Sequence, residues 1–383
     1  VDNLLWSVEL GNLDYGVYNI KLTVMDINGQ QAIDFIPISK SAGSYFEGWP
    51  LDTNSQVNSD LSLDNLNLDP KLEIVQVGMR KPNIFEYDGH IISNNFQIST
   101  NDLSNSVAIG DLDNNGHKDI VISSSNQVYV WKTDGFWLSG WPVSTPQNPN
   151  LALVDMDLDG NLEVIIVSYQ QVSVLNSNGM VHTGWPYSED RIAFSKPAIE
   201  DLDNDGYREI AIIGGDFWDG QNSKLYLFDH LGRILNGWPI TIESPFNNDP
   251  AIADLDLDGQ YEILAGSNIF TLSGNNYPGW PVQEGNLRNP VIGNIDDDNE
   301  LEIVLGKNGF IYLYDNSGVL KPGWPRKGGM YNTVLGDVDG DNKVEIITVC
   351  DALLCAYNSD GSLVDGWPIG RYYPRLELGG SSQ

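Results

Sequence analysis

The chain has 383 residues, 41% of them hydrophobic, and its 53 acidic residues against 20 basic ones give a formal net charge of −33. This charge argues against nucleic acid and anionic lipid surfaces as partners, because both would repel the chain. No run of about 18 apolar residues occurs, so no membrane insertion is expected. The chain begins with Val rather than Met, and we expect it to be a processed or excised piece of a longer protein.

Residues 1–43 differ in pattern from the remainder and are predicted to be a partial β-sandwich-like segment or a linker. Residues 18–26 alternate like a strand, 27–30 are typical of a hairpin turn, and 32–38 alternate again. The pattern is that of the closing hairpin of an immunoglobulin-like sandwich, although forty residues are too few for a complete one. We therefore predict a short immunoglobulin-like β remnant, or a small cap, before a second domain at 44–383.

The domain at 44–383 repeats one acidic loop seven times. The clearest copy runs from Asp201 to Glu209 with the sequence DLDNDGYRE, and the other copies begin at Asn65, Asp111, Asp155, Asp254, Asn294 and Asp337. A period of roughly 40–50 residues that carries strands and no helical pattern is the signature of a propeller or repeat array.

Each repeat contains four predicted strands. A first strand leads into the acidic loop (196–200, 249–253, 289–293), a second leaves it (209–213, 302–305, 345–349), and a third follows a tight turn (127–131, 224–228, 310–314). A fourth is expected to end in the tripeptide Gly-Trp-Pro. Four antiparallel strands per repeat make one propeller blade. The fold class predicted is therefore all-β, a seven-bladed β-propeller with four-stranded antiparallel blades.

The tripeptide Gly-Trp-Pro occurs seven times, with Trp at 49, 141, 185, 238, 280, 324 and 367. Proline is tolerated at strand ends and on edge strands, and we expect the tryptophan to wedge between neighbouring blades. The functional alternative is an aromatic lectin site at each tryptophan. For ring closure we expect the segment 46–51 to lie against the last blade, while the choice between it and 364–369 for the outer place stays open.

The acidic loops have the spacing of a calcium site, Asp-x-Asp-x-Asp-Gly-x-x-Glu. Ca²⁺ takes six to eight hard oxygen ligands. Positions 1, 3 and 5 turn their side chains inward, position 7 offers a backbone carbonyl, glycine at position 6 allows a sharp turn, and position 9 returns a carboxylate. An EF-hand is excluded because it needs a glutamate at position 12 on a helix, whereas position 9 here opens a strand.

We expect six or seven Ca²⁺ ions, because the first loop has Pro70 where glycine belongs and proline cannot reach positive φ. Mg²⁺ fits less well, since it prefers few protein ligands and retained waters. The candidate ligands are Asn65, Asn67, Asp69 and Glu73; Asp111, Asp113, Asn115, His117 and Asp119; Asp155, Asp157, Asp159, Asn161 and Glu163; Asp201, Asp203, Asp205, Tyr207 and Glu209; Asp254, Asp256, Asp258, Gln260 and Glu262; Asn294, Asp296, Asp298, Glu300 and Glu302; and Asp337, Asp339, Asp341, Lys343 and Glu345.

The two cysteines, Cys350 and Cys355, flank a predicted tight turn in the last repeat. We expect two small buried thiols, although a cross-strand bridge between them is geometrically possible.

From about residue 45 to 370 the chain resembles the FG-GAP or VCBS repeat family. The resemblance rests on the Asp-x-Asp-x-Asp-Gly loops and on the strand pair from Tyr226 to Pro239, with its pattern Tyr-Leu-Phe-Asp-x-x-Gly…Gly-Trp-Pro. It implies a seven-bladed propeller with calcium in the loop between the first and second strands of a blade. The Phe-Gly and Gly-Ala-Pro signatures of the animal proteins are not evident, so the resemblance points to the secreted microbial branch.

We expect a non-catalytic binding or adhesion module, extracellular or at the cell surface, for a glycan or protein ligand. The rim opposite the acidic loops is the expected ligand face, with Phe217 and Trp218 as candidate contacts and 187–191 next. The alternatives are a structural spacer or surface-assembly subunit, and an accessory domain of a secreted protease or polysaccharide-active enzyme. Catalysis by the chain itself is not expected, because it has four histidines and none lies near a nucleophile motif.

Overall fold

The computed structural model describes only β-strands and their connections, in two compact units, Val1–Asp52 and Thr53–Gln383. Within the described part of the chain, no helix has the length and apolar character needed to cross a bilayer. The described residues are 16–25, 31–40, 61–92 and 103–369, with gaps at 68, 70, 78–81, 87–89, 148, 217–222, 244–247, 286, 297, 299, 330–332 and 352.

The first unit contains an antiparallel hairpin of β1 (Gly16–Met25) and β2 (Gln31–Lys40), in which Met25 pairs with Gln31. The two strands predicted around a turn at 27–30 are therefore confirmed, and both are longer than predicted. The domain boundary at residue 43 and the immunoglobulin-like origin of the hairpin stay predictions.

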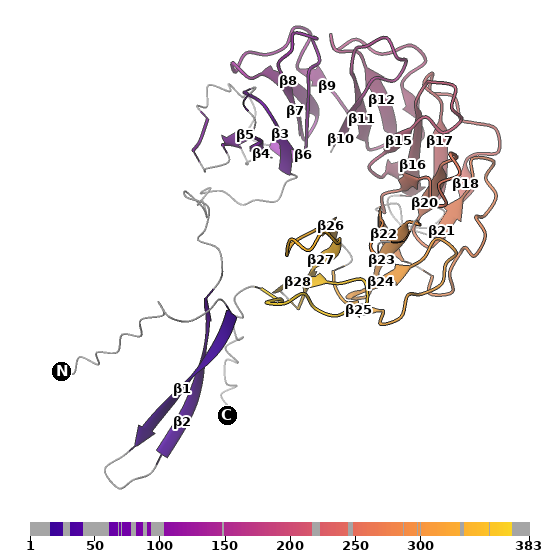
Figure 1. The fold of residues 1–383 in the computed structure, drawn as a ribbon. Helices are drawn as coiled ribbons and strands as arrows, with labels where there is room; N and C mark the ends of the chain where they lie inside the picture. The colour runs from indigo at the N-terminus through magenta and orange to yellow at the C-terminus, as the bar shows by residue number, and fades with distance from the viewer. Residues whose placement is uncertain are drawn as a thin grey trace, which may run out of the picture. The chain divides into compact units, whose positions relative to one another are not determined.

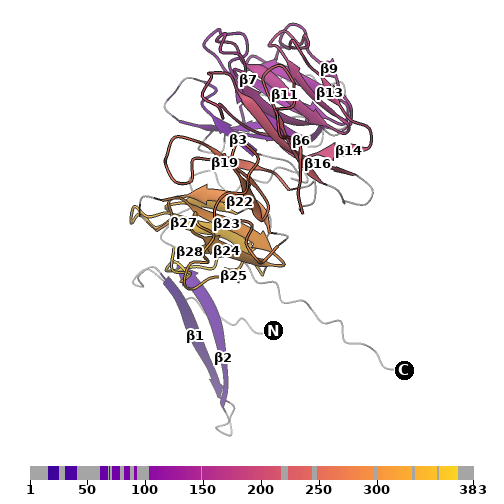
Figure 2. The same cartoon turned by 90° about the vertical axis from the view of Figure 1, so that its right-hand side faces the viewer.

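The second unit is a seven-bladed β-propeller in which each blade is one antiparallel sheet (Figure 1). In Figure 2 the strands β22 to β25 of the sixth blade lie side by side. The blades, in chain order, are β3 (Leu61–Asp64), β4 (Glu73–Val77) and β5 (Pro82–Phe85); β6 (Leu103–Gly110), β7 (Asp119–Ser124), β8 (Gln127–Lys132) and β9 (Val143–Ser144); β10 (Asn150–Val154), β11 (Glu163–Ser168), β12 (Gln171–Leu175) and β13 (Tyr187–Ser188); β14 (Ile192–Phe194), β15 (Ala198–Glu200), β16 (Glu209–Asp216), β17 (Lys224–Phe228) and β18 (Ile240–Thr241); β19 (Ala251–Ala253), β20 (Glu262–Ala265) and β21 (Asn268–Phe270); β22 (Arg288–Gly293), β23 (Glu302–Lys307), β24 (Phe310–Tyr314) and β25 (Arg326–Lys327); and β26 (Val334–Gly336), β27 (Glu345–Cys350) and β28 (Leu353–Tyr357).

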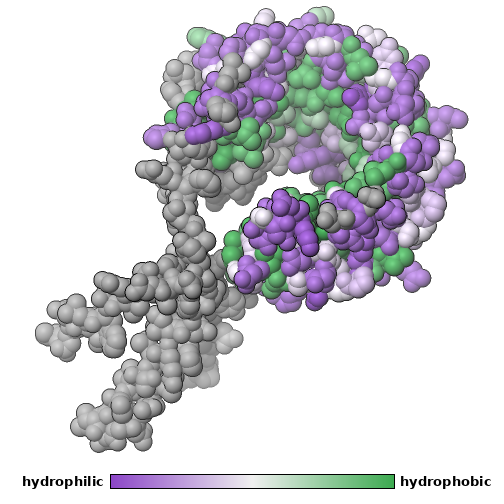
Figure 3. Space-filling model, in the orientation of Figure 1, coloured by the Kyte–Doolittle hydropathy of each residue, from purple (hydrophilic) through white to green (hydrophobic). Residues whose placement is uncertain are grey.

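The hydrophobic core lies between neighbouring blades rather than inside any one sheet. Alternate residues of a strand face opposite sides of its sheet, so Ile120 and Ile122 of β7 pack with Val75 of the first blade, whereas Val121 packs with Val164 of the third. The second strands are buried on both faces, as their apolar runs predicted. In Figure 3 hydrophobic residues gather mainly on the inner side of the blades and hydrophilic residues cover much of the outside.

The prediction that the fourth strand ends in Gly-Trp-Pro is wrong, because the tripeptide interrupts this strand. In the second blade Trp137 forms a bridge with Trp131, the tripeptide follows, and β9 then pairs with the start of β8. The Trp-Pro peptide bond is cis in all six described copies. A fourth strand of this kind is short: three of the sheets have only three regular strands among the described residues, and an isolated bridge adds the fourth segment.

The tryptophans of the tripeptide wedge between blades, as predicted. Those at 141, 185, 238, 280 and 324 are 5–8% exposed, and each indole N–H donates to a backbone carbonyl about 35–45 residues further on, in the next blade, at 2.8–3.1 Å. An aromatic lectin site at each of these five tryptophans is therefore wrong, because their rings are covered.

The outer place in the last blade is taken by the chain's own segment at 363–369. Leu363 bridges to Tyr357 and Ile369 to Leu354, with reciprocal backbone hydrogen bonds between Leu354 and Ile369 at 2.8 Å. The other segment proposed for this place, 46–51, lies outside the described residues.

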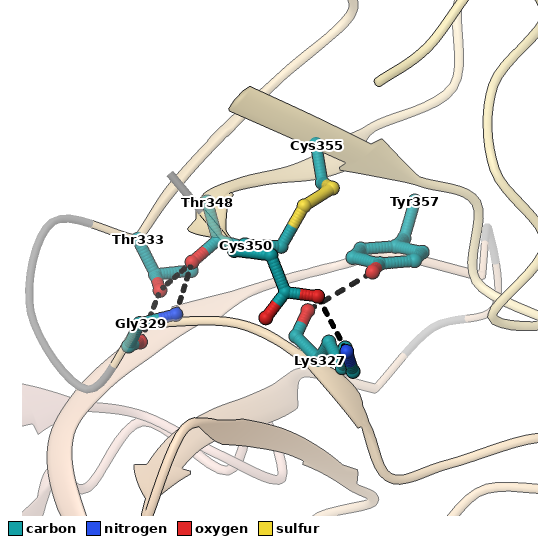
Figure 4. The surroundings of a disulfide bond; sticks show 8 residues. Lys327, Gly329, Thr333, Thr348, Cys350, Cys355 and Tyr357 are labelled. Carbon is teal, nitrogen blue, oxygen red and sulfur yellow. Dashed lines mark hydrogen bonds and ion pairs between the residues drawn. A yellow bond between two sulfur atoms is a disulfide. The ribbon is translucent and has the colours of Figure 1, made fainter. Parts of the chain in front are cut away.

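The expectation of two separate thiols is wrong, because Cys350 and Cys355 form a disulfide with their Cα atoms 5.9 Å apart (Figure 4). The two residues sit diagonally across the β27–β28 hairpin: Cys355 pairs with Thr348, two residues before Cys350. Diagonal neighbours in an antiparallel pair are within reach of each other, which is why the predicted turn allowed the bridge.

Candidate metal centres

All seven acidic loops connect the first and second strands of a blade, as the resemblance implied. We number the loops 1 to 7 in chain order and count positions 1 to 9 from the first residue of each. Position 9 opens the second strand in every loop, and its carboxylate is 0–4% exposed. A buried carboxylate needs hydrogen-bond donors or a cation to offset its lost hydration.

Position 9 receives one such donor in every loop. One carboxylate oxygen accepts a hydrogen bond from the backbone N–H of position 2 at 2.7–3.0 Å. In loops 1 to 6 the residue at position 2 is itself a buried hydrophobic residue, which ties the loop to the core, whereas Val338 in loop 7 is 38% exposed. The second oxygen of the position 9 carboxylate is left for another partner.

Positions 1 and 5 organise the loop backbone. The carboxylate at position 5, or the amide at Asn115, accepts from the N–H of position 7 at 2.7–2.8 Å in all seven loops. Where position 1 is aspartate, it accepts from one or two N–H groups at positions 4 to 6. The loop is therefore wrapped around its own carboxylates.

Two positions in the loop adopt left-handed backbone, and only one was predicted. Position 6 has positive φ at glycine, and Asn342 replaces glycine there with φ 66°, as expected. Position 4 is also left-handed, and it is leucine in loops 3 and 5, where Leu158 and Leu257 both have φ 59°. For leucine this conformation costs roughly 1–2 kcal/mol, so the surrounding loop must enforce it.

At least five loops bring ligand atoms of three acidic residues within 4.8 Å of one another among the described residues. In loops 2 to 5 these are positions 1, 3 and 9, and in loop 6 they are positions 3, 5 and 9. The predicted side chain at position 5 is not part of the groups in loops 2 to 5, and the side chains at position 7 point to solvent or its edge, which agrees with a carbonyl ligand there. The groups are Asp111, Asp113 and Asp119; Asp155, Asp157 and Glu163; Asp201, Asp203 and Glu209; Asp254, Asp256 and Glu262; and Asp296, Asp298 and Glu302.

The groups of loops 2 to 5 fit a hard divalent cation, whereas the group of loop 6 also contains the ammonium of Lys321. Every ligand atom is an oxygen, and Asp155 Oδ1 in loop 3 is buried without a hydrogen-bond donor, as is Glu73 Oε1 in loop 1, outside these groups. Buried acceptors normally have a partner. Carboxylate-rich oxygen sets suit Ca²⁺, and residues at 1, 3 and 9 would hold it.

In loops 2 to 5 and 7, burial raises the pKa of the carboxyl group at position 9, against the opposing hydrogen bond from position 2, and the other carboxylates of the loop raise it further. The pKa is raised to about 7 for Glu163, Glu209 and Glu262 and to about 6 for Asp119. The pKa of Glu345 is raised as well.

Loops 1 and 6 differ from the others because position 1 is asparagine. The amide nitrogen of Asn65 donates to the carbonyl of Asp69, and that of Asn294 donates to the carbonyl of Asp298. In both loops the side-chain amide of position 1 therefore donates to the backbone carbonyl of position 5. The expected weakness of the site at Asn65 stays a prediction, and Pro70 lies outside the described residues.

Side chains outside the loops also reach the carboxylates, and sequence reasoning missed them. Lys132 lies 2.8 Å from Asp113, beside a cavity of about 340 Å³ that is also lined by His117. In blade 5 the hydroxyl of Tyr277 donates to Asp256 at 3.0 Å.

Lys321 reaches the carboxylates of blade 6. Its burial opposes the charge, but the carboxylates of Asp296 and Glu302 outweigh that effect and raise the pKa of Lys321 to about 12. An alignment of the repeats on Gly-Trp-Pro could have identified this residue. Lys321 stands two residues before the tripeptide, at a position where the other blades carry no lysine.

On the opposite rim, the predicted contacts Phe217 and Trp218 lie outside the described residues. Of the second candidate, Tyr187 donates to Glu189 Oε2 at 2.7 Å, and Tyr226 of the next blade donates to the same oxygen at 2.9 Å. Arg191 is exposed and pairs with Asp216 at 3.6 Å. Glu189 thus links two blades, which is a structural role.

No protein-family model matches the chain, and no curated protein sequence matches it. Its fold is similar to solved propellers of low identity. These include the exotype rhamnogalacturonan lyase YesX (TM-score 0.54, 13% identity, covering 92% of this chain and 70% of the lyase) and the BP39L lectin from Burkholderia pseudomallei (0.53, 13%, 82% and 99%). A third is the V. cholerae biofilm matrix protein Bap1 (0.49, 14%, 94% and 82%). At these identities the similarity shows the fold alone, and membership of the FG-GAP or VCBS family stays a prediction.

Proposed function

We propose that the chain is a calcium-stabilised β-propeller that serves as a non-catalytic binding or adhesion module, for a glycan or protein ligand, within a larger secreted or surface protein. The observation that carries the calcium assignment is the group of three acidic residues that recurs from loop to loop, together with the buried Asp155 Oδ1 of loop 3, which has no hydrogen-bond donor. Three carboxylates this close repel one another by roughly 1–4 kcal/mol per pair. A cation between them turns that repulsion into attraction.

An extracellular location follows from the same assignment. Calcium sites in extracellular modules have Kd values on the order of 10⁻⁴–10⁻³ M. Sites of that strength fill outside cells and stay empty in cytosol. The role of the ion is to pin the hairpin between the first and second strands of a blade.

The ligand proposal draws on the fold and on the rim opposite the loops. The lectin of Burkholderia pseudomallei has the same fold at a TM-score of 0.53, which supports a glycan as the first ligand class to test. The lyase YesX supports a second candidate, polysaccharide cleavage, at a TM-score of 0.54.

The calcium assignment is tested by thermal denaturation with and without EDTA. We expect EDTA to lower the melting temperature by many degrees and added CaCl₂ to restore it, because each ion bound only by the folded state stabilises it. A melting temperature that EDTA leaves unchanged would refute the structural role of calcium.

The ligand class is tested by a glycan array in calcium-containing buffer, with rhamnogalacturonan turnover as a parallel assay. Binding without turnover supports a binding module. Turnover would overturn the non-catalytic assignment, and silence on the array with ordered self-assembly would favour a structural spacer.

A further inference from the structure

Loop 6 differs from the other loops because a lysine ammonium lies among its carboxylates. Lys321 Nζ is 2.5 Å from Asp296 Oδ2, 3.2 Å from Glu302 Oε1 and 3.9 Å from Asp298 Oδ2. These are the same three residues whose ligand atoms group within 4.8 Å. The lysine side chain is 18% exposed and that of Glu302 is fully buried, so the ammonium sits inside the loop rather than at its edge.

The position of Lys321 in its blade explains why it can enter the loop. It follows Leu320, the residue that bridges to the third strand at Tyr314, and its own N–H donates to the carbonyl of Leu313. In blade 5 the residue in the same register is Tyr277, whose hydroxyl reaches position 3 of its own loop. In blades 5 and 6, the residue two positions before Gly-Trp-Pro therefore points its side chain at the loop carboxylates, and in blade 6 that side chain is a cation.

The equivalent residues in the other blades do not place an ammonium among the carboxylates of their loops. They are Ile92, Leu138, His182, Leu235, Tyr277 and Val364. His182 is engaged with Asn176 at 2.8 Å. Lys132 in blade 2 comes from the end of the third strand, is 36% exposed and touches position 3 at 2.8 Å. It approaches its loop from outside, so it is not the counterpart of Lys321.

Loop 6 is also short of one carboxylate. Position 1 is Asn294, and its amide is engaged with the carbonyl of Asp298. A divalent cation in this loop would have one carboxylate fewer at positions 1, 3, 5 and 9 than in loops 3 to 5, and it would meet a positive charge at the centre of the remaining ones. Like charges at that separation repel strongly in a partly buried site.

We propose that Lys321 replaces the divalent cation in blade 6, so that loop 6 is held by an internal ammonium and binds no calcium. The proposal rests on the proposed function in that the remaining loops are taken to bind calcium. It assigns a different means of charge compensation to one blade and lowers the expected number of ions by one.

The test counts bound calcium per chain by native mass spectrometry and equilibrium dialysis for the wild type, K321M and K327M. Lys327 lies in the same blade, is 60% exposed and pairs with Asp351, so K327M removes the same charge without touching loop 6. We expect K321M to bind one more calcium ion than the wild type and K327M to bind the same number. A K321M count equal to or below that of the wild type overturns the proposal.

A second pair of variants tests whether loop 6 binds calcium even if K321M fails to fold. E302Q should leave the wild-type calcium count unchanged, because loop 6 holds no ion, whereas E209Q should lower it by one. A loss of one ion in E302Q contradicts the proposal. A wild type that binds no calcium refutes the proposed function instead, and a single site gained in K321M would then still support the role of Lys321.

Discussion

Single glycines set how closely neighbouring blades approach. Each described glycine of Gly-Trp-Pro has positive φ, and at Gly279 a Cβ atom would lie 1.9 Å from the carbonyl oxygen of Ser317 in the next blade. The adjoining Trp280 donates its indole N–H to Asn316 at 2.9 Å. The glycine and the tryptophan therefore act together. Because Gly279 has no side chain, the turn of the next blade can approach closely, and Trp280 then forms a hydrogen bond with that turn.

We predict that Gly279→Ala destabilises the propeller much more than Gly309→Ala. Both glycines have positive φ, but nothing lies within 4 Å of a Cβ at Gly309, so that variant bears only the conformational cost of roughly 1–2 kcal/mol. Gly279→Ala must also separate two backbones, and we expect at least about 2 kcal/mol more. The urea denaturation midpoints of the two variants measure the difference. Equal midpoints would show that the contact between blades at Gly279 can adjust to a Cβ atom at little cost.

The carboxyl groups of Glu163, Glu209 and Glu262 at position 9 make the stability of the cation-free protein depend on pH. A carboxyl whose folded pKa is raised holds a proton in the folded state that the unfolded chain releases, so stability is present below the unfolded pKa near 4.5 and is lost as the pH rises through the folded value. With values of about 7 for Glu163, Glu209 and Glu262, the window is about pH 4.5 to 7.

In EDTA we therefore predict a melting temperature that falls as the pH is raised from 5 to 8, and in excess calcium a much flatter profile. Because a metal ion needs deprotonated ligands, stabilisation by calcium should be larger at pH 8 than at pH 5.5. Glu209→Gln, which mimics the protonated group, should weaken the dependence in EDTA. A cation-free melting temperature independent of pH over this range would show that these groups titrate normally.

At the scale of elements, the strands that the sequence predicted best are those with buried apolar runs. The third strands at 224–228 and 310–314 match β17 and β24 residue for residue, and every acidic loop lies between a first and a second strand. The interrupted fourth strand was missed because the segments on either side of Gly-Trp-Pro, a single bridge and a strand of two residues in blade 2, are too short to carry a sequence pattern. Lys321 was missed because it is distant in sequence from the loop it enters, and spacing within a loop carries no information about such a partner.

The β27–β28 hairpin carries a covalent link that the other blades lack among the described residues. Its disulfide closes a loop with a sequence separation of 5, and short loops gain little from cross-linking. We predict that the double variant C350A/C355A loses about 2 kcal/mol at most. Melting of the wild type with and without a reductant should reproduce that loss, and a reductant effect on the double variant would mean that the reagent acts elsewhere.

At the scale of the whole molecule, acidity is concentrated where it is compensated locally. The net charge is −33, and much of it lies at the loops, at least five of which bring ligand atoms of three acidic residues within 4.8 Å of one another. Neighbouring loops also touch: Asn114 of loop 2 donates to the carbonyl of Gly160 in loop 3 at 3.0 Å, and Asn204 of loop 4 donates to Gly259 in loop 5 at 3.5 Å. A cation bound in one loop would therefore also restrain the edge of the next.

This arrangement predicts different responses to specific and non-specific ions. General screening of self-repulsion by NaCl should raise the melting temperature gradually over the range in which the Debye length shrinks from about 30 Å to about 10 Å. Calcium should act in addition, as a saturable rise that reaches a plateau once the sites are filled, since stabilisation by a bound ligand follows its occupancy. MgCl₂ at the same ionic strength should fall short of that plateau, because Mg²⁺ gives up its waters reluctantly and demands an octahedral cage. Melting curves at matched ionic strength in the three salts separate the two effects. If MgCl₂ or NaCl reached the calcium plateau, the loops would be responding to screening alone, and the blades would be held by their apolar interfaces without an ion in any loop.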